Sequence, residues 1–106
     1  MIKATFYSDG KSLSGFEIKG HSGYADEGSD IICASVSSAS YMAANTITEI
    51  IGEKADIEVS DGYLRLITRS DKNEVQTMLR GLQLHVNALA EDYKKYISCT
   101  EKLFKE

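Results

Sequence analysis

Two residues of this chain, His21 and Cys33, have the side chains and the spacing of a base and a thiol nucleophile. His21 ends a strand-like segment and Cys33 begins a helix-like one, and a short glycine-containing loop joins them. The macrodipole and the unpaired N–H groups of a first helical turn stabilise a thiolate. A histidine within reach can then complete an activated nucleophile. The pattern therefore predicts cysteine-based covalent catalysis.

Asp30 and Ser37 are the polar residues expected to support this pair. As an N-cap, Asp30 accepts hydrogen bonds from the first-turn amides, and as a third catalytic member it would orient His21. We favour the cap. Ser37 lies one helical turn after Cys33, where its hydroxyl bonds the thiolate or a substrate carbonyl, or bonds back to the carbonyl of Cys33.

The backbone around the pair has its own expected roles. Amides at the start of the helix, including that of Cys33, are expected to form an oxyanion hole. Three glycines permit loop movement or positive φ, and two acidic residues, Asp26 and Glu27, are expected to form a negative rim. The glycines are Gly20, Gly23 and Gly28.

Other chemistries fit the sequence less well. A cysteine phosphatase needs an arginine after five intervening residues, whereas Cys33 is followed by Ala-Ser-Val-Ser-Ser-Ala. A zinc site would have four candidate ligands but lacks the close paired spacing of zinc motifs; these are His21, Cys33, His85 and Cys99. We therefore expect no metal and no cofactor. A cysteine on an apolar helix is also often just a small buried side chain, so a non-catalytic binding module remains the alternative.

The elements that must position these residues follow from hydrophobic periodicity. Alternation predicts strands over 2–7, 13–20, 55–60 and 63–68, with turns at 8–12 and at Asp61-Gly62. Helical spacing predicts helices over 31–51, stopped by Gly52, and from a cap at Ser70 or Asp71 to Tyr93. Residues 97–100 are a candidate fifth strand. We expect one α+β domain over 1–106, with a mixed or antiparallel ββαββα sheet and both helices on one face.

The apolar stripes of the two helices define the expected core. The first stripe consists of Ile32, Val36, Ala39 or Ser40, Ala43, Ile47 and Ile50. The second consists of Val75, Leu79, Leu82, Val86, Leu89 and Tyr93.

The first helix has no charged residue from Ile31 to Thr48. Its positions outside the stripe are small or uncharged, which is unusual for a solvated helix face. Either the whole helix is buried in the monomer, or this face forms a homodimer interface or a groove wall. The positions are Ser35, Ser38, Tyr41, Met42, Ala44 and Asn45.

Charge and composition limit the class of protein. A net charge of −4 and a pI near 5.2 argue against direct nucleic-acid binding through a broad basic face and favour a basic partner. No apolar run is long enough to span a membrane, and the first residues alternate like a strand. Cys33 and Cys99 lie far apart and are expected to be reduced. Together these features predict a cytoplasmic protein.

The two segments around the pair carry a resemblance to a known family. Gly20 to Ala25 reads Gly-His-x-Gly-Tyr-Ala, and Gly28 to Ser37 reads Gly-x-Asp-Ile-hydrophobic-Cys-Ala-x-Val-Ser. This pattern resembles the ribosomal-processing cysteine protease family, Prp, and the element order and chain size agree throughout. The chain departs from the family at Ser35, where Ala or Gly is usual, and matches it weakly after Tyr93.

The resemblance implies a cysteine endopeptidase that removes a short N-terminal extension from large-subunit ribosomal protein twenty-seven during ribosome assembly. The family's nucleophile falls on Cys33 and its general base and acid on His21, while its recurrent aspartate and serine fall on Asp30 and Ser37. It also implies a homodimer, which would suit the uncharged helix face. On the alternative, the chain binds a ribosomal protein or an assembly intermediate without cleaving it.

Overall fold

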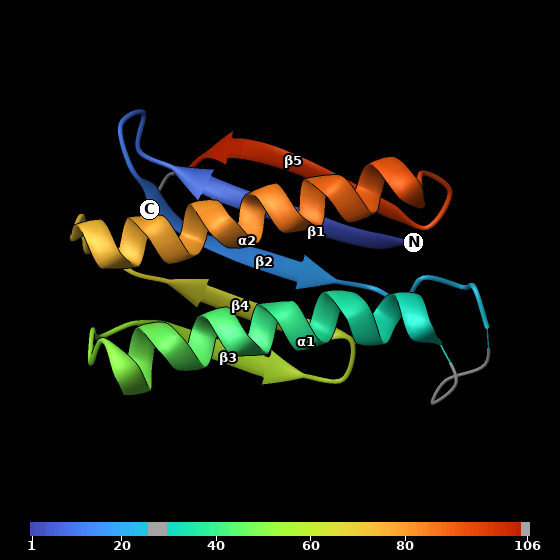
Figure 1. The fold of residues 1–106 in the computed structure, drawn as a ribbon, viewed down its shortest axis with the longest axis horizontal. Coiled ribbons are helices and arrows are strands. Elements are labelled where there is room, and N and C mark those ends of the chain that lie inside the picture. Colours follow the sequence, from blue (N-terminus) through green and yellow to red (C-terminus); the bar gives the residue numbers. More distant parts are fainter. Residues whose placement is uncertain (26–29, 105–106) are drawn as a thin grey trace.

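A five-stranded sheet with both helices packed on one face forms the protein, as Figure 1 shows for the computed structural model. The structure describes residues 1–25 and 30–104. The order confirms the expected ββαββα arrangement and the additional strand. In chain order the elements are β1 (Ile2–Ser8), β2 (Leu13–Lys19), α1 (Ile31–Asn45), the π-helical turn η1 (Thr46–Ile50), β3 (Asp56–Ser60), β4 (Tyr63–Ile67), α2 (Asn73–Asp92) and β5 (Ile97–Leu103).

The sheet is mixed, with the strand order β3-β4-β2-β1-β5. Its first four strands pair antiparallel, whereas β5 returns through α2 and pairs parallel with β1. Asp61 and Gly62 form the two-residue turn between β3 and β4, as their sequence predicts, because Gly62 supplies the positive φ of 67° that this turn needs. The pairing of β4 with β2 brings this turn beside the end of β2.

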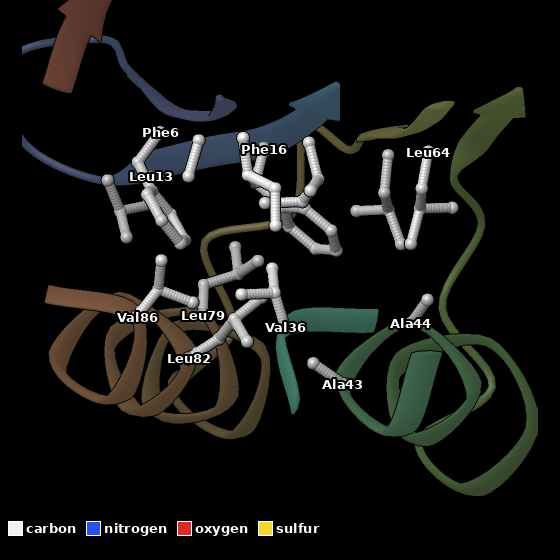
Figure 2. Packing of buried hydrophobic residues seen from close by; sticks show 14 of the residues in the cluster. Phe6, Leu13, Phe16, Val36, Ala43, Ala44, Leu64, Leu79, Leu82 and Val86 are labelled. Carbon is white, nitrogen blue, oxygen red and sulfur yellow. The ribbon is translucent and has the colours of Figure 1, made fainter. Parts of the chain in front are cut away.

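Alternation along the strands sends one set of side chains into the layer between sheet and helices. Phe6, Phe16 and Leu66 are fully buried partners on β1, β2 and β4. Figure 2 shows Phe6 and Phe16 facing Val36 of α1 and Leu79 of α2. Full burial of such side chains stabilises the fold by about 1.5–3 kcal/mol each, so this layer fixes the helices on the sheet.

The end of the first helix departs from the predicted stripe. A π-helical turn, closed by the hydrogen bond from the Ile51 amide to the Thr46 carbonyl, replaces the last α-helical turn. One extra residue in a turn rotates everything that follows it around the helix axis. Ile50, expected in the core, is therefore 81% exposed. Gly52 ends the helix with φ 77°, as predicted.

The expected cap of α2 is wrong. The helix begins after Lys72, which makes no side-chain capping hydrogen bond. The Ser70 hydroxyl instead accepts a hydrogen bond from the Lys72 amide inside the preceding turn, at 3.3 Å, and Asp71 lies exposed. Local side-chain bonds thus stabilise the connection rather than the helix end. The stripe itself is confirmed for Val75 to Val86, and Leu89 and Tyr93 are partly buried.

The uncharged face of α1 is open to solvent. Ser35, Ser38, Tyr41, Met42 and Asn45 are exposed, whereas Ala44 packs in the core. Deep burial of the whole helix is therefore wrong, because the sheet covers only the stripe side of α1. Among the described residues, no helix has the length and apolar character needed to cross a membrane.

Candidate active site

Three parts of the fold meet where the candidate residues lie. Figure 1 shows the start of α1, the end of β2 and the turn between β3 and β4 at the same end of the molecule. The Gly20 amide donates a 2.9 Å hydrogen bond to the Gly62 carbonyl, which joins the end of β2 to that turn. A Cβ at Gly20 would collide with the Met1 carbonyl oxygen, and its φ is 97°, so this position requires glycine.

Asp30 caps α1, as favoured from the sequence. Its Oδ1 accepts hydrogen bonds from the amides of Ile32 and Cys33, both at 3.0 Å. Its Oδ2 accepts a hydrogen bond from the Ser22 hydroxyl. These donors, first that of Ser22 and then that of Cys33, lower the pKa of the Asp30 carboxyl below its ordinary value. The carboxylate is thus held by α1 and Ser22, and the triad role toward His21 finds no support in its contacts.

Cys33 lies in the first turn of α1 with its side chain partly buried. Its Sγ accepts a hydrogen bond from the Ser22 amide at 3.3 Å. The sulfur thus has an N–H donor and lies at the positive end of the helix, close to the Asp30 carboxylate that caps it. The residue that follows His21 in sequence is therefore bound directly to the candidate nucleophile.

Ser22 was not among the predicted site residues. Its side chain is 4% exposed, and its hydroxyl accepts a hydrogen bond from the Tyr24 amide at 3.0 Å while donating to Asp30. In the sequence, a serine between a histidine and a Gly-Tyr pair looks like an ordinary loop serine, so nothing marks it as a site residue. Only the folding of this segment against the start of α1 reveals its partners.

His21 lies at the outer side of the site, with 54% of its side chain exposed. Its Nε2 is 3.9 Å from Asp61 Oδ2, close enough for an ion pair when the imidazole is protonated. The ring also lies over Gly62, because a Cβ there would be 2.8 Å from Nε2. Asp61 and Gly62 were predicted only as a turn, since their approach to His21 depends on a strand order that the sequence does not reveal.

The hairpin that carries Asp61 and Gly62 is tied to β2 by side chains as well. The Tyr63 hydroxyl donates a 2.8 Å hydrogen bond to Glu17 of β2. Burial, together with this carboxylate, raises the pKa of Tyr63 to about 12. Tyr63 therefore stays protonated and continues to donate, which holds the hairpin in place beside His21.

Two cavities adjoin the candidate pair. One, of about 220 Å³, lies between α1 and the β3–β4 hairpin, and Ile2, Ile18, Val36 and Leu64 contribute apolar walls to it. The other, of about 280 Å³, lies on the side of Gly23, Ala25 and Asp30. Both are lined by three of the predicted residues, and these are His21, Cys33 and Ser37. A chain that occupied both cavities would pass over the sulfur.

Ser37 lines both of these cavities. The residue is exposed, and within the described part of the chain its hydroxyl makes no hydrogen bond. Of the two alternatives for Ser37, the back-bond to the Cys33 carbonyl is therefore not formed, and the hydroxyl stays available to a bound carbonyl group. Its position one turn after Cys33 agrees with the helical spacing that predicted it.

Two of the expected oxyanion-hole donors at the start of α1 already have hydrogen-bond partners in this structure. The amides of Ile32 and Cys33 bond to the Asp30 carboxylate, and the Ala34 amide bonds to the Asp30 carbonyl at 3.1 Å. An N-cap satisfies the same donors that an oxyanion hole would need. The Ser37 hydroxyl, which makes no hydrogen bond to the described residues, is a further candidate donor in the cavities that Cys33 lines.

The loop residues are only partly described. Gly23 has φ 74° and lines the second cavity, in agreement with its predicted conformational role. Gly28 and the acidic pair Asp26 and Glu27 lie outside the described residues.

His85 and Cys99 lie elsewhere in the fold. His85 is exposed on α2, and Cys99 is partly buried on β5, where burial raises the pKa of its thiol to about 11. Across residues 1–25 and 30–104, no group of three or more His, Cys, Asp or Glu side chains is arranged to hold a metal ion. The four zinc candidates of the sequence are accordingly not gathered into one site.

Comparison with known proteins gives one consistent family. A family model described as cysteine protease Prp matches residues 1–98. The ribosomal processing cysteine protease Prp of Bacillus subtilis (strain 168) is 24% identical over 111 residues, covering 97% of this chain and 99% of the relative. The likeness extends over nearly the full length of both chains.

Solved structures agree with the fold. The essential ribosomal processing protease Prp from S. aureus, crystallised with a covalently linked product peptide, superposes with a TM-score of 0.88 at 24% identity. The same protease with a substrate peptide superposes with a TM-score of 0.83 at 23% identity. Each match covers 96% of this chain and 100% of the other.

Proposed function

The chain belongs to the cysteine protease Prp family, and from this premise we propose that it removes the N-terminal extension of large-subunit ribosomal protein twenty-seven, with Cys33 as nucleophile and His21 as general acid and base. Its curated relatives are ribosomal processing cysteine proteases, so the chain is a cysteine protease and its reaction is peptide-bond hydrolysis. We propose further that residues 1–106 form one protease domain that acts in the cytoplasm.

One observation carries the residue assignment. Cys33 and His21 line the same two cavities, and the Sγ of Cys33 accepts a hydrogen bond from the amide that directly follows His21. A cysteine that served only as a packed hydrophobe would not need such a donor or an opening to solvent. The arrangement supports a sulfur nucleophile and a base that share one site.

The proposed reaction has two steps. The Cys33 thiolate attacks the scissile carbonyl carbon and forms a C–S bond; as the C–N bond breaks, the His21 imidazolium gives its proton to the leaving amine. In the second step His21 takes a proton from water, whose oxygen attacks the thioester. Collapse of that intermediate releases the carboxylic acid and returns the thiolate.

Supporting roles follow from the contacts of the other residues. Ser37 donates its hydroxyl to the carbonyl oxygen, a role supported by its place in both cavities that Cys33 lines. Asp30 holds the first turn of α1 and so fixes Cys33. Gly20 lets the end of β2 bond to Gly62, which brings His21 over the hairpin turn. Gly23, with its positive φ of 74°, lets the loop turn beside the second cavity.

The site also suits the proposed substrate. A ribosomal protein segment is basic, and the carboxylate of Asp61 beside His21 is 81% exposed on a chain of net charge −4. The apolar walls of the 220 Å³ cavity would accept an apolar side chain next to the cleaved bond. We propose that two copies pair through the uncharged exposed face of α1, whose large apolar side chains include Tyr41 and Met42.

Cleavage of an extended ribosomal protein tests the assignment. The purified chain is incubated with large-subunit ribosomal protein twenty-seven that carries its N-terminal extension, and the product mass is recorded. We expect cleavage by the unchanged chain and by Cys99→Ala, and none by Cys33→Ala or His21→Ala. Binding of the substrate without cleavage by any of these proteins would instead favour the non-catalytic module.

A further inference from the structure

The residue between His21 and Gly23 joins the two halves of the candidate site. Ser22 is buried, with 4% of its surface exposed, and makes three hydrogen bonds there. Its hydroxyl donates to Oδ2 of Asp30 and accepts from the Tyr24 amide, and its own amide donates to the Sγ of Cys33. One residue thus contacts the helix cap, the loop and the sulfur.

We propose that Ser22 is a positioning residue, whose hydroxyl bond to Asp30 holds the His21 segment against the start of α1 and keeps the Ser22 amide on the Cys33 sulfur. The inference rests on the proposed function for its effect on turnover. Its effect on the thiol does not depend on any substrate.

The segment that carries His21 is attached to α1 mainly through Ser22. His21 itself is mostly exposed and contacts the exposed side chain of Asp61, so its own contacts restrain it weakly. The strong attachment is one residue later, where a hydroxyl bonds to a carboxylate that is itself fixed by two helix amides. Hydrogen bonds to ionised groups are about twice as strong as neutral ones. Ser22 therefore sets where the imidazole can lie relative to α1.

Ser22 also affects the charge around the Cys33 sulfur. Asp30 places a negative charge near Cys33, and this charge opposes formation of the thiolate. The Ser22 hydroxyl bonds to Oδ2, while the helix amides bond to Oδ1. Ser22 is the largest of the donors that lower the pKa of Asp30, and the Cys33 side chain is one of the smaller ones. At the same time the Ser22 amide donates to the sulfur. Without the hydroxyl, the Ser22 amide would no longer be held against the Cys33 sulfur, and the Asp30 carboxylate would lose one of its hydrogen-bond donors.

A matched control exists in the same chain. Ser8 is also a buried serine, 6% exposed, and its hydroxyl accepts a 3.0 Å hydrogen bond from the amide two residues later, at Gly10. It lies at the β1–β2 turn, far along the strands from Cys33. Ser8→Ala therefore removes the same kind of turn hydroxyl without touching Asp30 or the sulfur.

The experiment compares Ser22→Ala, Ser22→Thr and Ser8→Ala with the unchanged chain. The rate constant for iodoacetamide alkylation of Cys33 is followed by peptide mass spectrometry, and kcat and KM are measured with the extended ribosomal protein. Thermal unfolding is recorded so that rates are compared where each protein is folded. We expect Ser22→Ala to lower both the alkylation rate constant and kcat about tenfold, as loss of one hydrogen bond predicts, with KM changed less than about twofold.

The controls decide between positioning and mere packing. Ser8→Ala should react and turn over like the unchanged chain, and Ser22→Thr should recover most of the loss. Alkylation of Cys33 at an unchanged rate in Ser22→Ala would overturn the inference, as would equal losses in Ser22→Ala and Ser8→Ala. If Ser22→Ala does not fold, Ser22→Thr provides the test. A folded Ser22→Thr protein with a low alkylation rate constant and a low kcat would contradict the positioning role.

Failure of the proposed function would be seen as cleavage that persists in Cys33→Ala. Failure of the Ser22 role would be seen as an unchanged alkylation rate of Cys33 in Ser22→Ala, which is measured without substrate.

Discussion

The imidazole of His21 lies directly over the backbone of Gly62, so that a Cβ at Gly62 would be 2.8 Å from Nε2. The two residues are far apart in sequence and meet because β4 pairs with β2. The turn that closes the β3–β4 hairpin is thereby also the surface against which the candidate base rests.

Gly62→Ala should therefore impair catalysis by displacing His21. The added methyl group needs the space that the ring occupies, and φ at this position is 67°. We expect kcat to fall about tenfold, the effect of losing about 1.4 kcal/mol of transition-state stabilisation. Steady-state cleavage of the extended ribosomal protein measures it.

Gly52→Ala is the matched control for this change. Gly52 has a similar φ of 77°, but nothing lies within 4 Å of a Cβ there. Both substitutions should lower the free energy of unfolding by about 1–2 kcal/mol through backbone strain alone. Equal kcat losses in the two variants would show that His21 does not depend on Gly62.

Ser37→Ala should slow the chemical step. Ser37 lies in both cavities that Cys33 lines, and removal of one donor to a developing oxyanion costs about 10²-fold or more in kcat. Ser38→Ala removes the neighbouring exposed hydroxyl on α1, which lines neither cavity. A single-turnover assay should separate the two variants, and identical rates would remove Ser37 from the mechanism.

Alkylation should distinguish the two cysteines. Cys99 is partly buried on β5, and burial raises the pKa of its thiol to about 11, so at pH 8 only about one molecule in a thousand carries a reactive thiolate there. Cys33 has an N–H donor on its sulfur and opens to two cavities. Peptide mapping of a time course with iodoacetamide should show Cys33 modified first, and earlier labelling of Cys99 would contradict the assigned environments.

Asp30→Asn should separate capping from catalysis. Asparagine caps helices about as well as aspartate and can keep a weaker, neutral hydrogen bond to Ser22, so we expect only a small loss of peptidase activity and a small loss of stability at pH 7. A large loss of kcat with an unchanged melting temperature would instead make the Asp30 charge part of the chemistry.

The same variant should differ from the unchanged chain in acid. The bond from Ser22, followed by that from the Cys33 amide, lowers the pKa of Asp30 in the folded state. The folded chain then binds fewer protons than the unfolded one, so the carboxylate stabilises the fold above its ordinary pKa of 3.8 and loses this contribution as the pH falls through the lowered value. Urea unfolding between pH 5 and about pH 2 should show a steeper loss in the unchanged chain than in Asp30→Asn. Parallel curves would contradict the depressed pKa.

Much of the fold follows from local pattern. The strands were predictable because alternation is strong around Phe6 and Phe16, and the Asp61–Gly62 turn has residues that only a few turn types accept. The end of α1 was not predictable, since a π-helical turn shifts the phase of Ile50 without any proline or glycine inside the helix to announce it. The start of α2 was not predictable either, because the Ser70 hydroxyl bonds to the Lys72 amide within the preceding turn and does not cap the helix.

The site divides in the same way. Cys33, His21 and Asp30 were predictable because a helix start, a strand end and a cap are local features. Ser22, Asp61 and Gly62 were not, because their contacts depend on how β4 pairs with β2 and how the loop packs on α1. The bond of the Ile32 and Cys33 amides to Asp30 follows from the cap that the sequence also predicts.

The central claim is that the Cys33 sulfur becomes bonded to the carbonyl carbon of the substrate. Acid quenching during cleavage of the extended ribosomal protein, followed by mass spectrometry of the protease, tests it most directly. The account predicts an adduct with the mass of the acyl fragment on the peptide that contains Cys33, which is absent in Cys33→Ala together with cleavage. Cleavage that continues in Cys33→Ala, or an adduct on Cys99, would contradict it.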